Sequence, residues 1–212
     1  MKRGILTVLD KTIPYAKLYM KRKAGTPIPQ FLLPQGFRFV MFRDGDETHW
    51  ARIETSVAEF DGEFAALLLF KEQFIPHSDE LYRRLLFIET CEGVKVATAN
   101  AWWSYINKGW RNTLSKDDTD ERRAWVHWVS VDPKYQGLGL GKAVTSRVME
   151  IMRDIEGDVD MYLSTQTWSY KAVDIYKKCG FEPTDEELLY RYNKKEKNDY
   201  KKAIKILDGL KR

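Results

Sequence analysis

The chain has 212 residues, with 35 lysines and arginines against 31 aspartates and glutamates, and its formal net charge is +4. Hydrophobic residues make up 43% and charged residues 31% of the sequence, proportions that exclude a largely disordered chain. Because the basic excess is small, whereas a nucleic-acid binder needs a clustered basic face, we expect no nucleic-acid partner and only a mild preference for anionic ligands.

Two other features bear on compartment and partners. Cys91 and Cys179 lie far apart and match no metal-ligand spacing, which favours reduced thiols and no bound metal. Residues 1–9 contain a short apolar run but no small-residue cleavage site, so a signal peptide is not expected. The longest apolar run, residues 64–70, is far shorter than the ~18 residues that cross a bilayer. We therefore expect a soluble, cytoplasmic protein with no membrane partner.

Composition suggests one domain with two extensions. Residues 1–36 hold four of the seven prolines and a basic patch, which indicates a partly irregular N-terminal extension packed on the domain. Residues 37–192 contain the regular patterns and form the main domain. Residues 193–212 are a basic C-terminal helix or tail, with apolar residues on one helical face, namely Tyr200, Ile204, Leu207 and Leu210.

The first half of the main domain begins with a strand at residues 37–43 and a turn at 44–46. Asp46 then caps a helix whose apolar stripe recurs at helical spacing at Trp50, Ile53, Val57 and Phe60. A second helix is predicted at residues 63–74, although its apolar run is also compatible with a buried strand. Pro76 ends it. Residues 85–90 and 94–103 predict a hairpin around the turn at 91–93.

The second half alternates strands and helices. Strands are predicted at residues 124–131, 160–164 and 188–192, and helices at 140–153 and 169–178. Antiparallel pairing early in the chain and a strand–helix–strand crossover late predict an α/β (α+β) fold. We expect a central mixed, mostly antiparallel sheet of about six to seven strands flanked by helices.

A glycine-rich turn joins the strand at 124–131 to the next helix. Residues 134–142 read KYQGLGLGK, and glycines at alternate positions let backbone N–H groups approach a ligand. The first turn of a helix adds unpaired donors and partial positive charge, so the segment is suited to phosphate. The segment does not match the nucleoside-triphosphate loop, Gly-x-x-x-x-Gly-Lys-Ser/Thr, because Gln136 stands in place of the first glycine and Ala143 in place of the final Ser or Thr. The dinucleotide pattern also fails, less decisively, because its third glycine comes one residue early.

The segment is similar to the acyl-coenzyme A signature of the GNAT superfamily of N-acetyltransferases, Arg/Gln-x-x-Gly-x-Gly/Ala, matched by Gln136, Gly139 and Gly141. A second segment, with Ala172, Tyr176 and the Gly180–Phe181 ending, resembles the late helix of that family. Ser169 stands where family members often carry Asn. The resemblance covers residues 37–192 and is strongest over 124–182.

This resemblance implies a GNAT fold, acetyl-CoA (coenzyme A) as the donor and direct transfer of an acetyl group to a primary amine in a ternary complex. It further implies that the glycine loop grips the pyrophosphate and that the preceding strand pairs with the pantetheine arm. The implied cofactor-binding residues are Val129, Ser130, Val131, Gln136, Gly137, Leu138, Gly139, Leu140, Gly141, Lys142, Ser169 and Tyr176.

Acetyl transfer to an amine needs a base, because alkyl amines are mostly protonated at neutral pH. His127 is the leading catalytic candidate, and strand alternation predicts that it shares a face with Trp125, Val129 and Val131. The alternative is a histidine merely hydrogen-bonded within an aromatic wall, and His49 and His77 are weaker candidates. Tyr176 is the candidate acid by resemblance, with a core aromatic as the alternative. A main-chain N–H of residues 129–131 would polarise the thioester carbonyl.

The acceptor is not identified by the sequence: a small amine, an amino acid, an antibiotic or a peptide end all remain open. Several aromatic residues on or near two strands are candidates for lining its pocket, although core packing is expected for most, namely Trp102, Trp103, Tyr105, Trp110, Trp125 and Trp128. Transfer of another acyl group, a hydroxyl or thiol acceptor, and a non-catalytic coenzyme A sensor are the alternatives. A homodimer is also open.

Overall fold

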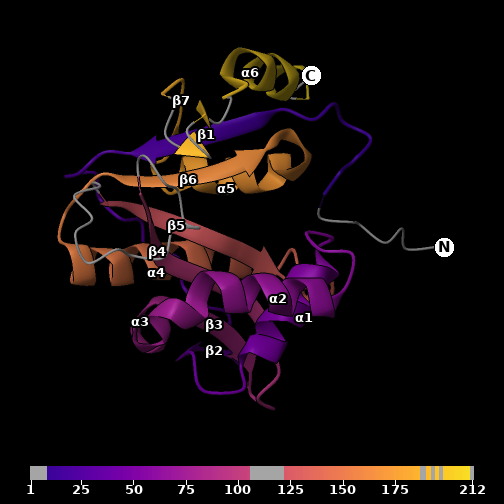
Figure 1. Cartoon of the computed structure of the whole chain (residues 1–212), viewed down its shortest axis with the longest axis vertical. Helices are drawn as coiled ribbons and strands as arrows, with labels where there is room; N and C mark the ends of the chain where they lie inside the picture. Colours follow the sequence, from indigo (N-terminus) through magenta and orange to yellow (C-terminus); the bar gives the residue numbers. More distant parts are fainter. Residues whose placement is uncertain (1–8, 106–121, 187–189, 192–193, 196–197, 211–212) are drawn as a thin grey trace.

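The fold is built on a seven-stranded sheet whose strand order is β2-β3-β4-β5-β6-β1-β7. The computed structural model describes residues 9–105, 122–186, 190–191, 194–195 and 198–210 (Figure 1). Every neighbouring pair in the sheet is antiparallel except β5–β6, which is parallel. The mixed, mostly antiparallel sheet of an α/β fold, expected from the sequence, is therefore confirmed.

The strands of the sheet are β1 (Lys17–Arg22), β2 (Phe37–Met41), β3 (Leu85–Thr90), β4 (Lys95–Tyr105), β5 (Arg122–Val131), β6 (Met161–Gln166) and β7 (Glu182–Thr184). A separate two-stranded sheet joins β8 (Tyr190–Arg191) to β9 (Lys194–Lys195). The helices are α1 (Glu47–Ser56), α2 (Glu63–Phe74), α3 (Ser78–Arg84), α4 (Leu140–Glu156), α5 (Tyr170–Lys178) and α6 (Tyr200–Gly209). Short 3-10 turns occur at η1 (Ile75–His77), η2 (Pro133–Tyr135) and η3 (Thr167–Ser169).

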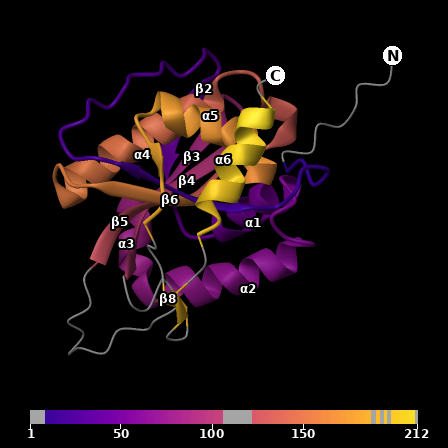
Figure 2. The same ribbon diagram turned by 90° about the horizontal axis from the view of Figure 1, so that it is seen from above.

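Helices cover both faces of the sheet, and each face has its own core (Figure 2). On one face α4, α5 and α6 bury a cluster of mostly aliphatic residues with every second residue of the strands, such as Leu18, Ala99 and Val126. On the other face α1, α2 and α3 bury a cluster dominated by aromatic rings, including Trp50, Phe70 and Trp102. Two-sided burial explains why β3 is buried along its whole length.

Most of the elements fall where the sequence predicts them. The hairpin β3–β4 turns at Gly93, whose φ of +84° lies in the left-handed region that glycine adopts most easily. Helix α4 is amphipathic and ends at Gly157, with a φ of +81°. Helix α6 lies within the predicted basic tail and buries Ala203 and Leu207. No helix among the described residues is long and apolar enough to span a bilayer.

The N-terminal extension differs from the irregular segment expected from its prolines. Residues 17–22 form β1, which lies between β6 and β7 and pairs antiparallel with both. Leu18, Tyr19 and Met20 are completely buried. The prolines flank this strand, at Pro14 and Pro27, and so leave its hydrogen-bonding ladder intact.

Two further differences are local. Helix α3 was not predicted. Pro76 indicated that the preceding helix ends, and seven residues are too few to show the helical repeat of apolar positions. The last predicted strand, at 188–192, corresponds only to β8, and its other residues lie outside the described part of the chain. Both cysteines are free, Cys91 exposed and Cys179 buried.

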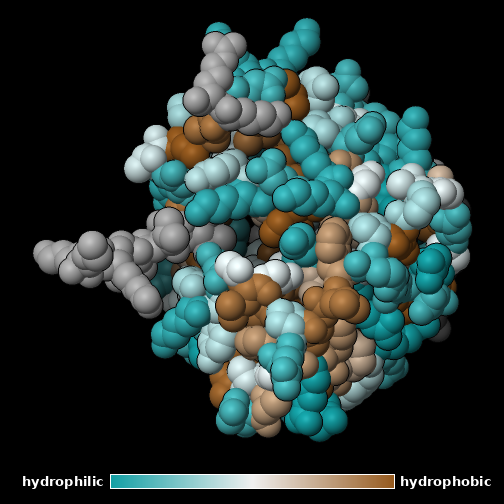
Figure 3. Space-filling model, turned by 180° about the vertical axis from the view of Figure 1, so that it is seen from behind, coloured by the Kyte–Doolittle hydropathy of each residue, from teal (hydrophilic) through white to brown (hydrophobic). Residues whose placement is uncertain are grey.

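The surface on the α4 side also gathers hydrophobic residues, seen in the lower half of the molecule in Figure 3. Phe31, Phe37 and Phe39 pack from outside against the aliphatic core on this side. Phe37 meets Tyr135 edge to face, with ring centroids 6.2 Å apart. Phe31 of the extension and the strand β2 therefore help to close the core on the α4 face.

We predict that Met20→Ala destabilises the fold by about 2–5 kcal/mol, because it opens a cavity in a completely buried strand. Leu32→Ala is the control, since Leu32 belongs to the same extension but is 92% exposed. Urea denaturation of both variants measures the free energy of unfolding. Equal stability of Met20→Ala and wild type would contradict the placement of β1 inside the sheet.

Candidate active site

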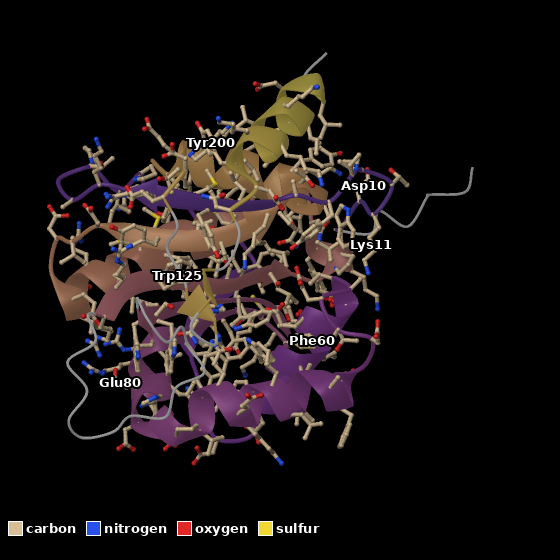
Figure 4. All side chains as sticks on the ribbon, turned by 45° about the horizontal axis from the view of Figure 1, so that its top comes forward. Asp10, Lys11, Phe60, Glu80, Trp125 and Tyr200 are labelled. Atoms are coloured by element: carbon tan, nitrogen blue, oxygen red, sulfur yellow. The ribbon has the colours of Figure 1, made fainter. Side chains whose placement is uncertain are left out.

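The central feature of the site is the separation of the only parallel strand pair described. Strands β5 and β6 are paired at Ala124–Met161 and Trp125–Tyr162, and beyond these positions their backbones part. A cavity of about 200 Å³ opens there, lined by residues 125–130 of β5, residues 163–166 of β6, Glu54 of α1, Ala172 and Tyr176 of α5, and Leu9, Val57, Glu59 and Ser169. In Figure 4 Trp125 lies on β5, between the α1–α2 helix pair and β1.

A β-bulge shapes one wall of the cavity. Thr98 of β4 is opposite Ser130 of β5 and Asn100 is opposite His127, so Trp128 and Val129 share one β4 residue. Trp128 has a φ of +50°, a conformation that bulky residues rarely adopt. The extra residue changes which face each later side chain occupies.

Because of the bulge, the alternation of faces predicted along β5 is wrong beyond Trp128. Val129 and Val131 pack against the aliphatic core on the α4 side. His127 contacts Gln73 of α2, and Ser130 contacts Glu54 of α1, so both face the opposite side. His127 therefore shares its face with Ser130 rather than with Val129 and Val131, because simple alternation assumes an unbroken strand.

His127 lies in a hydrogen-bonded chain that fixes its orientation. The Trp128 indole N–H donates to Gln73 Oε1 (2.9 Å), which leaves the amide nitrogen of Gln73 facing His127 Nε2 at 3.3 Å. Since that amide nitrogen can only donate, His127 Nε2 acts as the acceptor and Nδ1 carries the proton. Burial lowers the pKa of His127 to about 3, and the positive charge of Lys17 contributes. His127 is thus a neutral imidazole at physiological pH.

Glu54 is a site residue that the sequence reasoning missed. Its side chain is completely buried, and Glu54 Oε2 accepts a hydrogen bond from Ser130 Oγ (2.9 Å). Burial raises the pKa of Glu54 to about 8, and the nearby charge of Glu59 adds to the rise. A signal was present in the sequence, because Glu54 follows Trp50 by four residues and so lies on the buried stripe of its helix. A carboxyl group there is unusual and marks a functional candidate.

Tyr176 and Ser169 form the wall on the α5 side. The Tyr176 side chain is 7% exposed, and burial raises the pKa of its hydroxyl above the ordinary value, so the phenol keeps its proton. Ser169 lies at the start of α5 and its Oγ is 3.3 Å from the Gln166 side-chain nitrogen, which donates to it. The predicted residues His127, Tyr176 and Ser169 thus line one cavity.

The glycine loop follows β5 and is accessible. Gly137 and Gly139 have φ angles of +81° and +86°, and a Cβ built at either would meet no atom within 4 Å, so the space beside them is open. The bond from the Ala143 N–H to the Gly139 carbonyl (3.2 Å) begins α4, which leaves the preceding N–H groups without intrahelical partners. Leu138 at the tip is 50% exposed.

Side chains hold the base of this loop in place. Asp132 Oδ1 accepts from the Lys134 N–H (3.0 Å), and Arg52 of α1 pairs with Asp132 Oδ2 at 3.1 Å. Gln136 donates through Nε2 to the Val131 carbonyl (2.9 Å), so its side chain fastens the loop to β5. Lys142 lies above the Phe31 ring, 5.3 Å from its centroid. Residues 136–142 therefore form a candidate anion-binding site at the end of β5, which is called the anion seat below.

The aromatic residues divide between core and cavity. Trp102 and Trp103 are buried and stacked on each other, with centroids 4.2 Å apart, as expected for core packing. Trp125 and Trp128 line the cavity. The side chain of Tyr105 and the whole of Trp110 lie outside the part of the chain that the structure describes. His77 packs against Trp103 and does not line the cavity.

The arrangement is suited to proton transfer beside an anion seat. A carboxyl whose pKa is near the working pH, a neutral imidazole and a protonated phenol surround one cavity, and their environments have driven their pKa values apart. Along the cavity, the edges of β5 and β6 that face each other have no partner strand among the described residues, so their peptide groups are available to an extended ligand.

Comparisons with known proteins identify similar sequences. A family model described as the acetyltransferase (GNAT) family matches residues 28–181. An N-alpha-acetyltransferase of Sulfurisphaera tokodaii is 26% identical over 110 residues, which cover 51% of this chain and 62% of that protein. A thialysine N-epsilon-acetyltransferase of Sus scrofa is 34% identical over 59 residues, covering 28% of this chain and 34% of that protein.

Solved structures give the same fold. A GCN5-related N-acetyltransferase from Sphaerobacter thermophilus superposes with a TM-score of 0.59 at 18% identity, covering 81% of this chain and 49% of that one. An acetyltransferase of the GNAT family from Colwellia psychrerythraea gives a TM-score of 0.55 at 13% identity, over 81% of this chain and 54% of that one. The aligned parts thus span less than two thirds of these proteins.

We predict that the stability of the protein falls as pH rises because of Glu54. In the unfolded chain Glu54 ionises near pH 4.5, whereas in the folded protein its pKa is about 8. Between these values the unfolded state binds fewer protons, so rising pH favours unfolding, with a slope of at most about 1.4 kcal/mol per pH unit.

Urea denaturation of wild type and Glu54→Gln at pH 5, 6.5 and 8 measures this effect, and groups common to both proteins cancel in the difference. We expect the free energy of unfolding of Glu54→Gln, relative to that of wild type, to increase from pH 5 to pH 8. A difference that stays constant with pH would mean that the Glu54 pKa is ordinary.

Proposed function

The chain belongs to the GNAT acetyltransferase family, and from this premise we propose that it transfers an acetyl group from acetyl-coenzyme A to a primary amine, with both bound together. The observation that carries the proposal is the cavity between β5 and β6, which Glu54, His127 and Tyr176 all line, on the strand that leads into the glycine loop. Two relatives bear N-acetyltransferase names, which supports a nitrogen acceptor.

The residues present fit a coenzyme A thioester. Open space beside Gly137 and Gly139 and the free N–H groups at the start of α4 suit a diphosphate. We propose that the backbone of residues 136–142 holds it, while Val129 to Val131 and Ser169 hold the arm that leads into the cavity. The thioester, when bound, supplies the activated acyl group.

We propose Glu54 rather than His127 as the proton acceptor for the amine. The Nε2 lone pair of His127 already faces Gln73, and with a pKa of about 3 the imidazole holds a proton poorly. Glu54 has a pKa of about 8, close to the working pH, which is the condition for an effective base. His127 instead offers its Nδ1–H as a donor and orients polar groups in the cavity.

Tyr176 takes the role of the acid in this proposal. Its phenol stays protonated, and Tyr176 on α5 lines the same cavity as Glu54 on α1. A proton held at Tyr176 Oη is therefore available for a departing thiolate. The main-chain N–H groups of β5 at Val129 to Val131, next to the bulge, are the candidates for polarising a carbonyl.

We predict that Gly139→Glu abolishes coenzyme A binding, because it places a carboxylate at the anion seat in a residue with a φ of +86°. Gly139→Ala is the control, since it places a side chain in the same left-handed backbone conformation without the charge. Isothermal titration calorimetry measures both. Wild-type affinity of Gly139→Glu would refute the loop assignment.

We predict that thiol release from acetyl-coenzyme A, measured on a panel of primary amines, depends on Glu54. Glu54→Gln lowers kcat/KM about 100-fold or more and removes a rise in rate centred near pH 8. The same acceptor is used for both proteins, so its own ionisation cancels.

Other outcomes of this assay separate the alternatives. If His127→Ala removes the rise and Glu54→Gln keeps it, His127 is the base. Thiol release with hydroxyl or thiol acceptors alone would change the acceptor class. Coenzyme A binding without release of thiol on any acceptor would identify a non-catalytic sensor.

A further inference from the structure

A group of buried polar atoms behind the cavity wall has no partner among the described protein atoms. It comprises Trp50 Nε1, Glu54 Oε1, Thr98 Oγ1 and both amide atoms of Asn100. Each of these four residues is completely buried. A buried polar group without a hydrogen bond costs about 1–3 kcal/mol, so five such atoms on two elements that border the same strand need an explanation.

These atoms lie around a continuous circuit of contacts. Trp50 and Glu54 are one helical turn apart on α1, and Glu54 is hydrogen-bonded to Ser130 on β5. Ser130 is opposite Thr98 on β4, and two residues further along β4 Asn100 is opposite His127. His127 returns to Trp50 through Gln73 and Trp128, whose ring centroid is 5.4 Å from that of Trp50.

The donors and acceptors of this group are complementary. Trp50 supplies one N–H, Asn100 two N–H groups and an oxygen, Thr98 a hydroxyl and Glu54 a carboxylate oxygen. They do not bond directly to one another, which is the situation in which water bridges polar groups in proteins. A buried water typically makes about three hydrogen bonds, and the group offers enough partners for it.

We propose that Trp50, Glu54, Thr98 and Asn100 enclose a binding site for ordered water, and that Thr98 and Asn100 act through this water as positioning residues for the Glu54 carboxyl group. The inference rests on the proposed function only where it concerns catalysis. The water site itself follows from the buried polar atoms.

In this arrangement the two carboxyl oxygens of Glu54 have different surroundings. Oε2 is held by Ser130, whereas Oε1 faces the water site. Donors there stabilise the ionised carboxylate and so limit the rise that burial causes in its pKa. The other titratable groups around Glu54 are Glu59 in the turn after α1, His127 on β5, which senses the charge of Lys17, and Tyr176 on α5. None of these changes in the variants described next.

Thr98→Val and Thr98→Ser form a matched pair, since valine keeps the shape of the side chain and serine keeps its hydroxyl. If ordered water bonds to Thr98, Thr98→Val loses those bonds and its thermal midpoint falls by roughly 2–8 °C. If Thr98 Oγ1 is instead dry and unsatisfied, the same change removes a desolvation penalty and the midpoint rises. A rise would overturn the proposal.

The titration of Glu54 is the second readout, and it does not depend on turnover. Carbon-13 NMR of the glutamate carboxyl groups, with Glu54→Gln for assignment, gives its midpoint. We expect Thr98→Val and Asn100→Leu to raise this midpoint and Thr98→Ser to keep that of wild type. An unchanged midpoint in both of the first two variants would refute the positioning role.

Ser104→Ala is the control, because Ser104 lies on the same strand with a buried, unpartnered Oγ but outside the circuit. Its Glu54 titration stays that of wild type. If these results are obtained but no amine is acetylated, the water site stands and only the proposed reaction fails.

Discussion

The bulge at Trp128 is the constraint on which the site depends. An unbroken β5 would turn Val129 and Val131 away from the aliphatic core and would keep Ser130 away from Glu54. One extra residue reverses this, so that Ser130 reaches α1 while the valines remain in the aliphatic core. The left-handed φ of Trp128 is a local strain, and the surrounding contacts stabilise it. Its indole is hydrogen-bonded to Gln73 and packs against Trp50 and Phe60.

The N-terminal strand holds the other wall of the cavity. Strand β6 pairs with β5 over only two residue pairs, but it pairs with β1 along its whole length, from Met161 to Gln166. The chain before β1 is also fastened to the turn after β6, because Thr167 Oγ1 donates to the Pro14 carbonyl and Trp168 Nε1 to the Ile13 carbonyl, at 2.6 and 2.7 Å. These bonds keep β6 in place where it leaves β5, and they bring Leu9 to the cavity.

The sequence predicted those parts of the structure that local rules determine. The glycine spacing at residues 136–142, the turn at Gly93 and the amphipathic pattern of α4 depend on residues close together in the chain. The position of β1 depends on partners some 150 residues away, so its prolines were misleading. The bulge and the role of Glu54 were missed for a similar reason. A carboxyl group on an apolar stripe can be noticed in a sequence, but its pKa depends on what the fold places around it.

The protonation states of the site follow from burial acting on groups of opposite charge. Removal from water disfavours the charged form, so it raises the pKa of Glu54 and lowers that of His127. Both side chains are therefore largely neutral at pH 7, and the protein avoids an isolated buried charge in either. Only the carboxyl has a pKa close enough to neutrality to exchange its proton readily. The same desolvation that weakens the histidine as a base therefore makes the glutamate an effective one.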